Sequence, residues 1–230
     1  MARGLRNQVI FTLVLLIILI SGCSSLGQIP LNPGTREQLK SYREILIVHY
    51  HPLPALIVNR GLYSDSSTLP LEDPLLRVIE RFSHDLSAEL GISSFRMIEK
   101  NRLSRDISVL KMAFGTGMVI DFDTTHWWLN RIRTLRGLFI NSDMDPYALT
   151  YEVRARLIRL DDSKILWQNT CFISDRNPQI WGELEANDFS LLKKERLDTA
   201  DACAQELIDY FLGRATQSFG TGHPVYSPSK

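Results

Sequence analysis

The strongest pattern in the chain is an alternation of apolar and polar side chains between residues 147 and 157. Odd positions are apolar, whereas the even positions from 150 onward carry Thr150, Glu152, Arg154 and Arg156. A period of two is typical of a strand with one buried face. A turn over residues 161–164 precedes a second apolar stretch, residues 165–173, and this pattern predicts an antiparallel hairpin.

Another strand, residues 118–125, is predicted ahead of the hairpin. Two carboxylates, Asp121 and Asp123, fall on one face of it, and apolar side chains fall on the other. Shorter apolar runs predict strands at residues 45–50, 55–58 and 95–98. The residues from 59 to 70 are predicted to form a loop.

Helical spacing of apolar residues marks two long segments. The first, residues 73–91, begins at a suitable cap, Asp73, and ends at a suitable stop, Gly91. Its apolar face carries Leu75, Val78, Ile79, Phe82, Leu86 and Leu90. The second, residues 191–212, closes the domain. Shorter helices are predicted at residues 178–187 and at residues 104–115, where Ile107, Leu110, Met112 and Phe114 would point inward.

The order of these elements indicates the fold class. Helices occur early in the domain and a strand meander occurs late, which favours an α+β fold. We predict a single mixed, mostly antiparallel sheet with helices packed mainly on one face. A doubly wound parallel sheet is disfavoured, because a short hairpin joins two of the last strands.

The first residues of the chain have the organisation of an export signal. Arg3 and Arg6 precede a run from 9 to 20 that is apolar except for Thr12. Such a run spans roughly 18 Å as a helix, which is too short for the ~30 Å hydrocarbon core of a bilayer. It ends in Ile20-Ser21-Gly22-Cys23, which resembles the lipobox of bacterial lipoproteins.

This resemblance implies that residues 1–22 are a signal peptide and that Cys23 is acylated. Several acyl chains attach a protein to a membrane almost permanently. Ser24 follows Cys23, whereas an Asp at this place often retains such lipoproteins at the inner membrane. We therefore expect attachment to the outer membrane, on its periplasmic face. The alternatives are an ordinary signal peptide or an uncleaved anchor in the inner membrane.

Composition divides the mature chain into three parts. Residues 23–43 contain Gly and Pro with little apolar periodicity and are predicted to be a flexible tether behind the lipid. Residues 44–213 are sufficient for one domain with a single core. Residues 214–230 are rich in Gly, Pro, Ser and Thr and are predicted to be a disordered tail.

Charge excludes several classes of function. The chain holds 26 Lys and Arg against 26 Asp and Glu, and loss of the signal peptide removes two Arg, which leaves a net charge of −2. A protein that binds polyanions through a global basic excess is not expected. Gly115 and Gly117 join a helix to a strand, the reverse of the order in a phosphate-binding loop. We therefore expect neither a nucleotide nor a nucleic acid as a partner.

The domain resembles a group of uncharacterised proteobacterial lipoproteins over residues 44–213, in the stretches FGTGMVIDFDTTHWWL, YEVRARLIRLDDSKILWQNTC and ADACAQEL. Its arrangement of elements is also similar to the N-terminal domain of the TolB translocation protein and to the lipoprotein activators of penicillin-binding proteins. These resemblances imply a small α/β domain in the cell envelope. They imply no activity and no site residues.

Two pairs of polar side chains could form a catalytic or metal site. His49 and His51 share a strand face, as do Asp121 and Asp123, and His126 is nearby. If the strands are neighbours, these residues could bind zinc or act as acid and base in a periplasmic hydrolase. They could instead be polar positions of a half-buried sheet. The chain has no H-E-x-x-H, C-x-x-C or G-x-S-x-G spacing, so we expect no catalytic residue, no metal and no cofactor.

The most suggestive surface feature is an aromatic pair followed by three arginines. Trp127 and Trp128 cannot both enter one face of a sheet, so we expect one of them outside the main core. Arg131, Arg133 and Arg136 follow, and Trp and Arg are enriched at binding hot spots. We predict an interaction surface here; Trp at a sheet edge and Arg on a solvated loop is the alternative.

The remaining cysteines, Cys171 and Cys203, are predicted to form a disulfide. Both lie on the apolar faces of their elements, and export to an oxidising compartment permits a bond. It would close a loop of about 30 residues and stabilise the fold by roughly 3 kcal/mol. Two buried free thiols are the alternative.

The sequence as a whole predicts a lipid-anchored binding protein. We expect it to serve as an accessory or assembly factor in the cell envelope and to contact a protein partner there.

Overall fold

The structure is a computed structural model, and it describes residues 28–42, 44–58, 66–69, 71–102, 105–132, 145–174, 178–186 and 189–214. The predicted signal peptide, Cys23, and residues 215–230 of the predicted tail lie outside these ranges. Arg133 and Arg136 also lie outside them. Within the described ranges, no helix combines the length and apolar character needed to cross a membrane.

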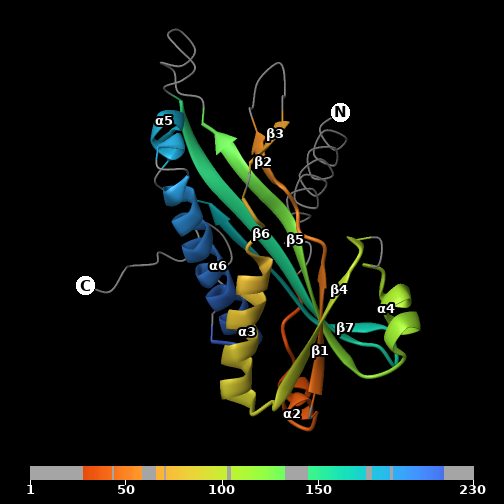
Figure 1. The fold of residues 1–230 in the computed structure, drawn as a ribbon. Coiled ribbons are helices and arrows are strands. Elements are labelled where there is room, and N and C mark those ends of the chain that lie inside the picture. The colour runs from red at the N-terminus through yellow and green to blue at the C-terminus, as the bar shows by residue number, and fades with distance from the viewer. Residues whose placement is uncertain are drawn as a thin grey trace, which may run out of the picture.

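One mixed sheet organises the domain (Figure 1). Its strands are β1 (Glu44–Tyr50), β2 (Ala55–Val58), β3 (Ser66–Leu69), β4 (Ser94–Lys100), β5 (Met118–Arg131), β6 (Pro146–Arg159), β7 (Lys164–Ser174) and β8 (Gln179–Ile180). The antiparallel ladder β5–β6–β7 forms the long central part. On the other edge of β5, β1 pairs parallel with one half of the strand and β2 with the other half.

The helices in the described part of the chain are α2 (Pro33–Leu39), α3 (Leu75–Leu90), α4 (Ile107–Phe114), α5 (Trp181–Glu185) and α6 (Ser190–Phe211). The long helices α3 and α6 lie side by side along one face of the sheet (Figure 1). Helices α2 and α5 add Leu39 and Leu184 to the core on this face. Of the described helices, α4 packs on the opposite face, where it covers one end. The predicted α+β fold with helices mainly on one face is confirmed.

The main core lies between α3, α6 and the sheet. Strand alternation directs Phe122 and Trp127 of β5 and Trp167 of β7 to the helix side, where each is at most 1% exposed. Phe82 of α3 and Phe211 of α6 meet them, with ring centroids 5.2 Å apart for Phe82–Phe122 and 4.8 Å apart for Trp167–Phe211. These aromatic contacts join the two long helices to the sheet.

The limits of α3 follow from local chemistry, close to those predicted. Asp73 accepts a hydrogen bond from the Leu75 backbone N–H at 3.0 Å, which satisfies one of the free donors of the first turn. The helix ends at Gly91, whose φ of +69° places it in the left-handed region that glycine adopts most readily.

The predicted tether is wrong for the part of it that the structure describes. Residues 33–39 form α2, and Leu39 is fully buried. Ahead of α2, Ile29 forms a two-hydrogen-bond bridge with Gln168 on the outer edge of β7. The segment has too little apolar periodicity to predict this packing, because it is held largely by backbone hydrogen bonds and by the Arg36 side chain, which donates to the Leu212 carbonyl.

Two further predictions need correction. The predicted loop at residues 59–70 contains β3, which pairs antiparallel with β2. In α4, Met112 is 81% exposed instead of pointing inward. Each helical residue turns the chain by about 100°, so Met112 lies roughly 200° around the helix from Leu110, which is buried at 1% exposure.

The predicted disulfide is present in the structure. It joins Cys171 of β7 to Cys203 of α6, with a Cα–Cα distance of 5.5 Å, well inside the range that a bridge allows. Both cysteines are fully buried. The bond therefore fixes the closing helix to the last long strand of the meander.

A carboxyl group on α6 makes the stability of the fold depend on pH. Burial raises the pKa of Glu206 from 4.5 to about 7. The folded state therefore holds this proton more tightly than the unfolded state does, and stability falls as the pH rises from 4.5 to about 7. We expect Glu206→Gln, which cannot ionise, to raise the unfolding temperature at pH ~8 but not at pH ~4.

Thermal unfolding of the wild type and the variant at both pH values measures this effect. The control is Glu80→Gln, which removes an exposed carboxylate from α3 and should give no pH-dependent gain. An equal gain for Glu206→Gln at both pH values would contradict the argument.

Candidate functional site

The sheet face opposite α3 and α6, which we call the open face, divides into three zones along β5 and β6. At one end, α4 covers Val119 and Ile158. In the middle lies a network of arginines and aspartates. At the other end lies a groove that no helix covers among the described residues. The middle and far zones are the candidate functional sites.

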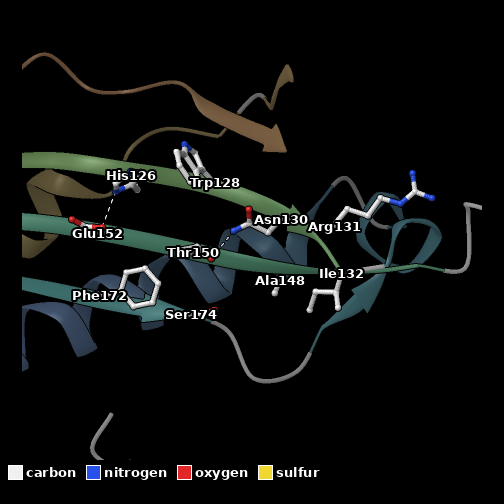
Figure 2. A pocket seen from close by; sticks show the side chains of 10 residues that line it. All are labelled: His126, Trp128, Asn130, Arg131, Ile132, Ala148, Thr150, Glu152, Phe172 and Ser174. Carbon is white, nitrogen blue, oxygen red and sulfur yellow. Dashed lines mark hydrogen bonds and ion pairs between the residues drawn. The ribbon is translucent and has the colours of Figure 1, made fainter. Parts of the chain in front are cut away.

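The far zone is a shallow groove of about 490 Å³ across β5, β6 and β7. Figure 2 shows its lining: His126, Trp128, Asn130, Arg131, Ile132, Ala148, Thr150, Glu152, Phe172 and Ser174. We call it the Trp128 groove.

Aromatic side chains and a rim of paired polar groups characterise this groove. The ring of His126 packs edge-on against Trp128 at 4.3 Å and pairs through Nδ1 with Glu152 Oε2 at 2.7 Å. Asn130 donates to the Thr150 hydroxyl at 2.7 Å. Phe172 is 37% exposed on the neighbouring strand. The side chains of the groove are thus held in place by one another.

The structure separates the two adjacent tryptophans, as predicted. Trp127 is 1% exposed on the helix side, where its ring meets Tyr151 at 5.3 Å. Trp128 is half-buried and lies in the groove (Figure 2). Of the pair, only Trp128 can therefore take part in an interaction surface.

Of the three arginines in the predicted surface, Arg131 lines the end of the groove and is paired with a buried carboxylate. Its side chain is 15% exposed and pairs with Asp145, itself only 3% exposed, at 3.1 Å. Arg131 therefore neutralises a buried carboxylate at the end of the groove. The other two arginines of the predicted surface, Arg133 and Arg136, are not among the described residues.

In the middle zone, Asp121 is fully paired. Arg156 donates to it through Nε at 2.9 Å and through Nη2, and the Tyr50 hydroxyl donates at 2.9 Å. Arg156 also donates to the Arg105 carbonyl at 3.0 Å. Burial and the nearby charge of Asp121 raise the pKa of Tyr50 well above its usual value, so the hydroxyl remains a donor.

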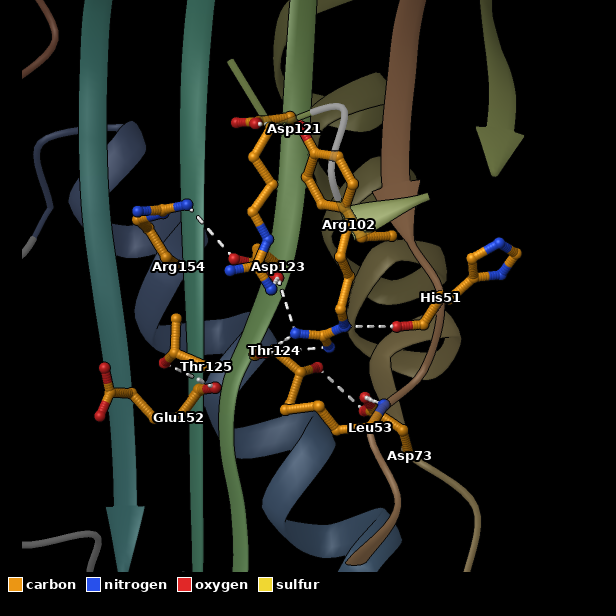
Figure 3. A network of polar contacts seen from close by, with 12 residues as sticks. His51, Leu53, Asp73, Arg102, Asp121, Asp123, Thr124, Thr125, Glu152 and Arg154 are labelled. Atoms are coloured by element: carbon orange, nitrogen blue, oxygen red, sulfur yellow. Dashed lines mark hydrogen bonds and ion pairs between the residues drawn. The ribbon is translucent and has the colours of Figure 1, made fainter. Parts of the chain in front are cut away.

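The second carboxylate of this zone, Asp123, is shared by three arginines, of which Arg102 and Arg154 are labelled in Figure 3. Arg105 Nη2 lies 2.8 Å from it, Arg154 Nη2 lies 3.2 Å away, and Arg102 Nη1 lies 3.6 Å away. Burial raises the pKa of Asp123, and the positive charges of the three arginines partly offset this rise. We call these four residues the Asp123 cluster.

Arg102 also bridges the break between β1 and β2 along the edge of β5. Strand β1 pairs with β5 as far as Phe122, and β2 begins to pair at Trp128. Between them, Arg102 donates through Nε to the His51 carbonyl at 2.9 Å and through both Nη atoms to the Thr124 carbonyl at 3.2 Å. These bonds satisfy backbone acceptors that a continuous strand would otherwise pair.

The structure does not bring the predicted His and Asp side chains together. His49 is in register with Phe122 and so faces the helix side, whereas Asp121 faces the open side. His51 pairs with Glu99 at 2.7 Å beyond the end of β1, and His126 pairs with Glu152. Among the described residues, no group of three or more His, Cys, Asp or Glu could hold a metal ion. The hydrolase alternative therefore lacks the assembled site that it requires.

Comparison with known proteins identifies no family. No family model matches the chain, and no curated protein matches it. Among solved structures, it is similar to a protein of Xanthomonas campestris described by the family model DUF330, at 9% identity and a TM-score of 0.40 over 74% of this chain and 85% of that one.

Two lipoproteins are also among the similar structures. Lipoprotein GNA1162 from Neisseria meningitidis has 14% identity and a TM-score of 0.32 over 72% of this chain and 98% of that one. A minor lipoprotein from Acinetobacter baumannii has 9% identity and a TM-score of 0.35 over 75% and 92%. With scores this low, the similarities identify neither a family nor a function.

Proposed function

We propose that this protein is an outer-membrane lipoprotein whose periplasmic domain binds an envelope protein through the Trp128 groove, as an accessory or assembly factor. The observation that carries the proposal is the groove itself. It lies on the open face, combines Trp128 and Phe172 with a paired polar rim, and so has the apolar centre and polar border of a protein interface.

Its side chains suit a binding role for a second reason. The contact between His126 and Trp128 and the bond between Asn130 and Thr150 exist before any partner arrives. Side chains that are already fixed lose less conformational freedom on binding. A half-buried Trp in such a setting is the kind of residue that dominates binding energy.

The lipid anchor is supported by the lipobox-like Ile20-Ser21-Gly22-Cys23. Cys23 precedes Ile29 by six residues, and Ile29 is bonded to the edge of β7. Six residues span at most about 20 Å. An acyl group on Cys23 would therefore keep the β7 edge close to the membrane surface.

Site-specific photocrosslinking in intact cells tests the binding proposal. A photoreactive phenylalanine analogue at position 128 should give a light-dependent adduct with one envelope protein. The matched control is the same analogue at Leu76, which is 52% exposed on α3 and should give no such adduct. Equal adducts from both positions, or none from position 128, would count against the groove.

Purified components then test the energetic role of Trp128. Once the adduct identifies the partner, Trp128→Ala should weaken its binding by about tenfold or more, as expected for a hot-spot residue. Leu76→Ala should leave the affinity unchanged. Undiminished binding by Trp128→Ala would show that the partner contacts another surface.

A further inference from the structure

Three arginines share a single carboxylate on the open face. We propose that Arg102, Arg105 and Arg154 form a cradle for a phosphoryl group, free or carried by a lipid headgroup. The proposal goes beyond the binding of a protein partner and uses no residue of the Trp128 groove, so either can fail without the other.

Arginines outnumber the aspartates that they pair with in the middle zone. In the middle zone, Arg102, Arg105, Arg154 and Arg156 face Asp121 and Asp123. Arg156 neutralises Asp121, which leaves three guanidinium groups around the one charge of Asp123.

Among the described residues, Asp123 is the one carboxylate that forms ion pairs with these three arginines, although the charge of Asp73 also acts on Arg102. Glu152 pairs with His126, and Glu99 pairs with His51. Asp73 accepts bonds from Leu53, Leu75, Thr124 and Tyr151, and Asp106 caps α4.

The three arginines are accessible to solvent, whereas the carboxylate that they share is not. The side chains of Arg102, Arg105 and Arg154 are 25%, 35% and 29% exposed, whereas Asp123 is 1% exposed. Arg156, which is saturated by Asp121, is only 10% exposed. The three arginines that share Asp123 are thus the ones that a ligand from solution can reach, and the carboxylate lies beneath them.

The arginines are also held in position without a ligand. Asp123 fixes one Nη atom of each of Arg105 and Arg154. Carbonyl groups of His51 and Thr124 fix Arg102. Positioned guanidinium groups lose little entropy when they bind, and their planar forks match the oxygens of a phosphoryl group. A phosphoryl group would add negative charge beside three guanidinium groups that share one directly paired carboxylate.

The path of the chain makes a membrane phosphate a reachable source. Arg154 is in register with Thr170 of β7, two residues from Gln168, where Ile29 bonds to the strand edge. If Cys23 carries lipid, the cradle lies near the membrane surface. A soluble phosphate compound in the same compartment is the other source, and the experiments below distinguish the two.

Calorimetry of the full mature chain tests the site with inorganic phosphate. Cys23→Ser is included so that no acyl chain complicates the measurement. We expect phosphate to bind more tightly than chloride at matched ionic strength. Arg105→Gln/Arg154→Gln should weaken binding about tenfold to a hundredfold, as expected for loss of one or two charge-assisted hydrogen bonds. The control Arg77→Gln removes an exposed arginine that is paired with Asp201 on the helix side and should change nothing.

A second variant separates a binding role from a structural one. Asp123→Asn removes the negative charge of the cluster but keeps a side-chain oxygen that can still accept a hydrogen bond from an arginine and hold it in position. A cradle for anions should then bind phosphate more tightly. Weaker binding by an Asp123→Asn protein whose circular dichroism shows it folded would overturn the proposal.

Vesicle flotation with the same chain identifies the source. Flotation with vesicles that contain phosphatidic acid, but not with pure phosphatidylcholine, supports a headgroup as the ligand when Arg105→Gln/Arg154→Gln abolishes it. Phosphate binding without flotation supports a soluble ligand. The proposal is overturned if the wild-type arginines bind neither phosphate nor vesicles, or if Arg77→Gln reduces binding equally.

Discussion

Arg156→Ala is expected to lower the free energy of unfolding by about 3–5 kcal/mol, among the largest effects of any single substitution in the domain. Asp121 is only 2% exposed, and Arg156 supplies its neutralising charge through two nitrogen atoms. Removal of the guanidinium leaves a buried carboxylate with the Tyr50 hydroxyl as its remaining donor. A buried charge without its partner is far more costly than the intact pair.

Denaturant unfolding measures this loss, and a neighbour on the same strand provides the control. Arg159 is also on β6, but it pairs with the exposed Asp162, so Arg159→Ala should leave the unfolding midpoint nearly unchanged. Replacing both buried partners, as in Asp121→Leu/Arg156→Met, should recover most of the stability. If Arg156→Ala unfolds at the same midpoint as Arg159→Ala, the buried pair does not have the energetic role assigned to it.

Reduction of the Cys171–Cys203 bond is expected to cost the fold about 3–4 kcal/mol. The bond closes a loop between residues separated by 32 positions, and a crosslink of this span restricts the unfolded chain by roughly that amount. It also holds α6 against β7, so its loss should loosen the closing helix first. Equilibrium unfolding with and without reductant measures the difference.

The Cys171→Ala/Cys203→Ala variant shows whether the reductant acts on this bond alone. It should resemble the reduced wild type, and reductant should not change its midpoint further. A wild-type midpoint that is insensitive to reductant, in a protein whose thiols become alkylated, would contradict the expected contribution.

Periodicity predicted most of the fold, and it failed where the period is interrupted. The β6–β7 hairpin, α3 and α6 follow directly from repeats of two and of about 3.6. Strand β5 was predicted to end at Thr125, but it continues to Arg131. A bulge between Thr124 and His126 shifts the register there, so the side chains that follow change face and the alternation is lost from the sequence.

The candidate sites were predictable only in part. The shared face of Asp121 and Asp123 follows from alternation, as does that of Arg154 and Arg156. Their pairing depends on the register of β5 with β6, in which Asp121 faces Arg156 and Asp123 faces Arg154.

Arg102 and Arg105 carry no such signal in the sequence. Both lie between β4 and α4, because α4 begins at Ile107 and not at residue 104 as predicted, and they reach Asp123 only because β4 pairs with β1 and β1 with β5. The prediction of a joint His and Asp site failed for a related reason. Spacing shows which residues of one strand share a face, but it does not show on which side of the sheet that face lies.

The mass of the N-terminal peptide, measured on protein isolated from outer-membrane fractions, tests the central claim most directly. If the protein is an outer-membrane lipoprotein, its chain begins at Cys23 and carries a diacylglyceryl group and an amide-linked acyl chain. The Cys23→Ala protein is then missing from this fraction. An unmodified Cys23 within a peptide that still contains Gly22, or a Cys23→Ala protein that remains in the outer membrane, would contradict it.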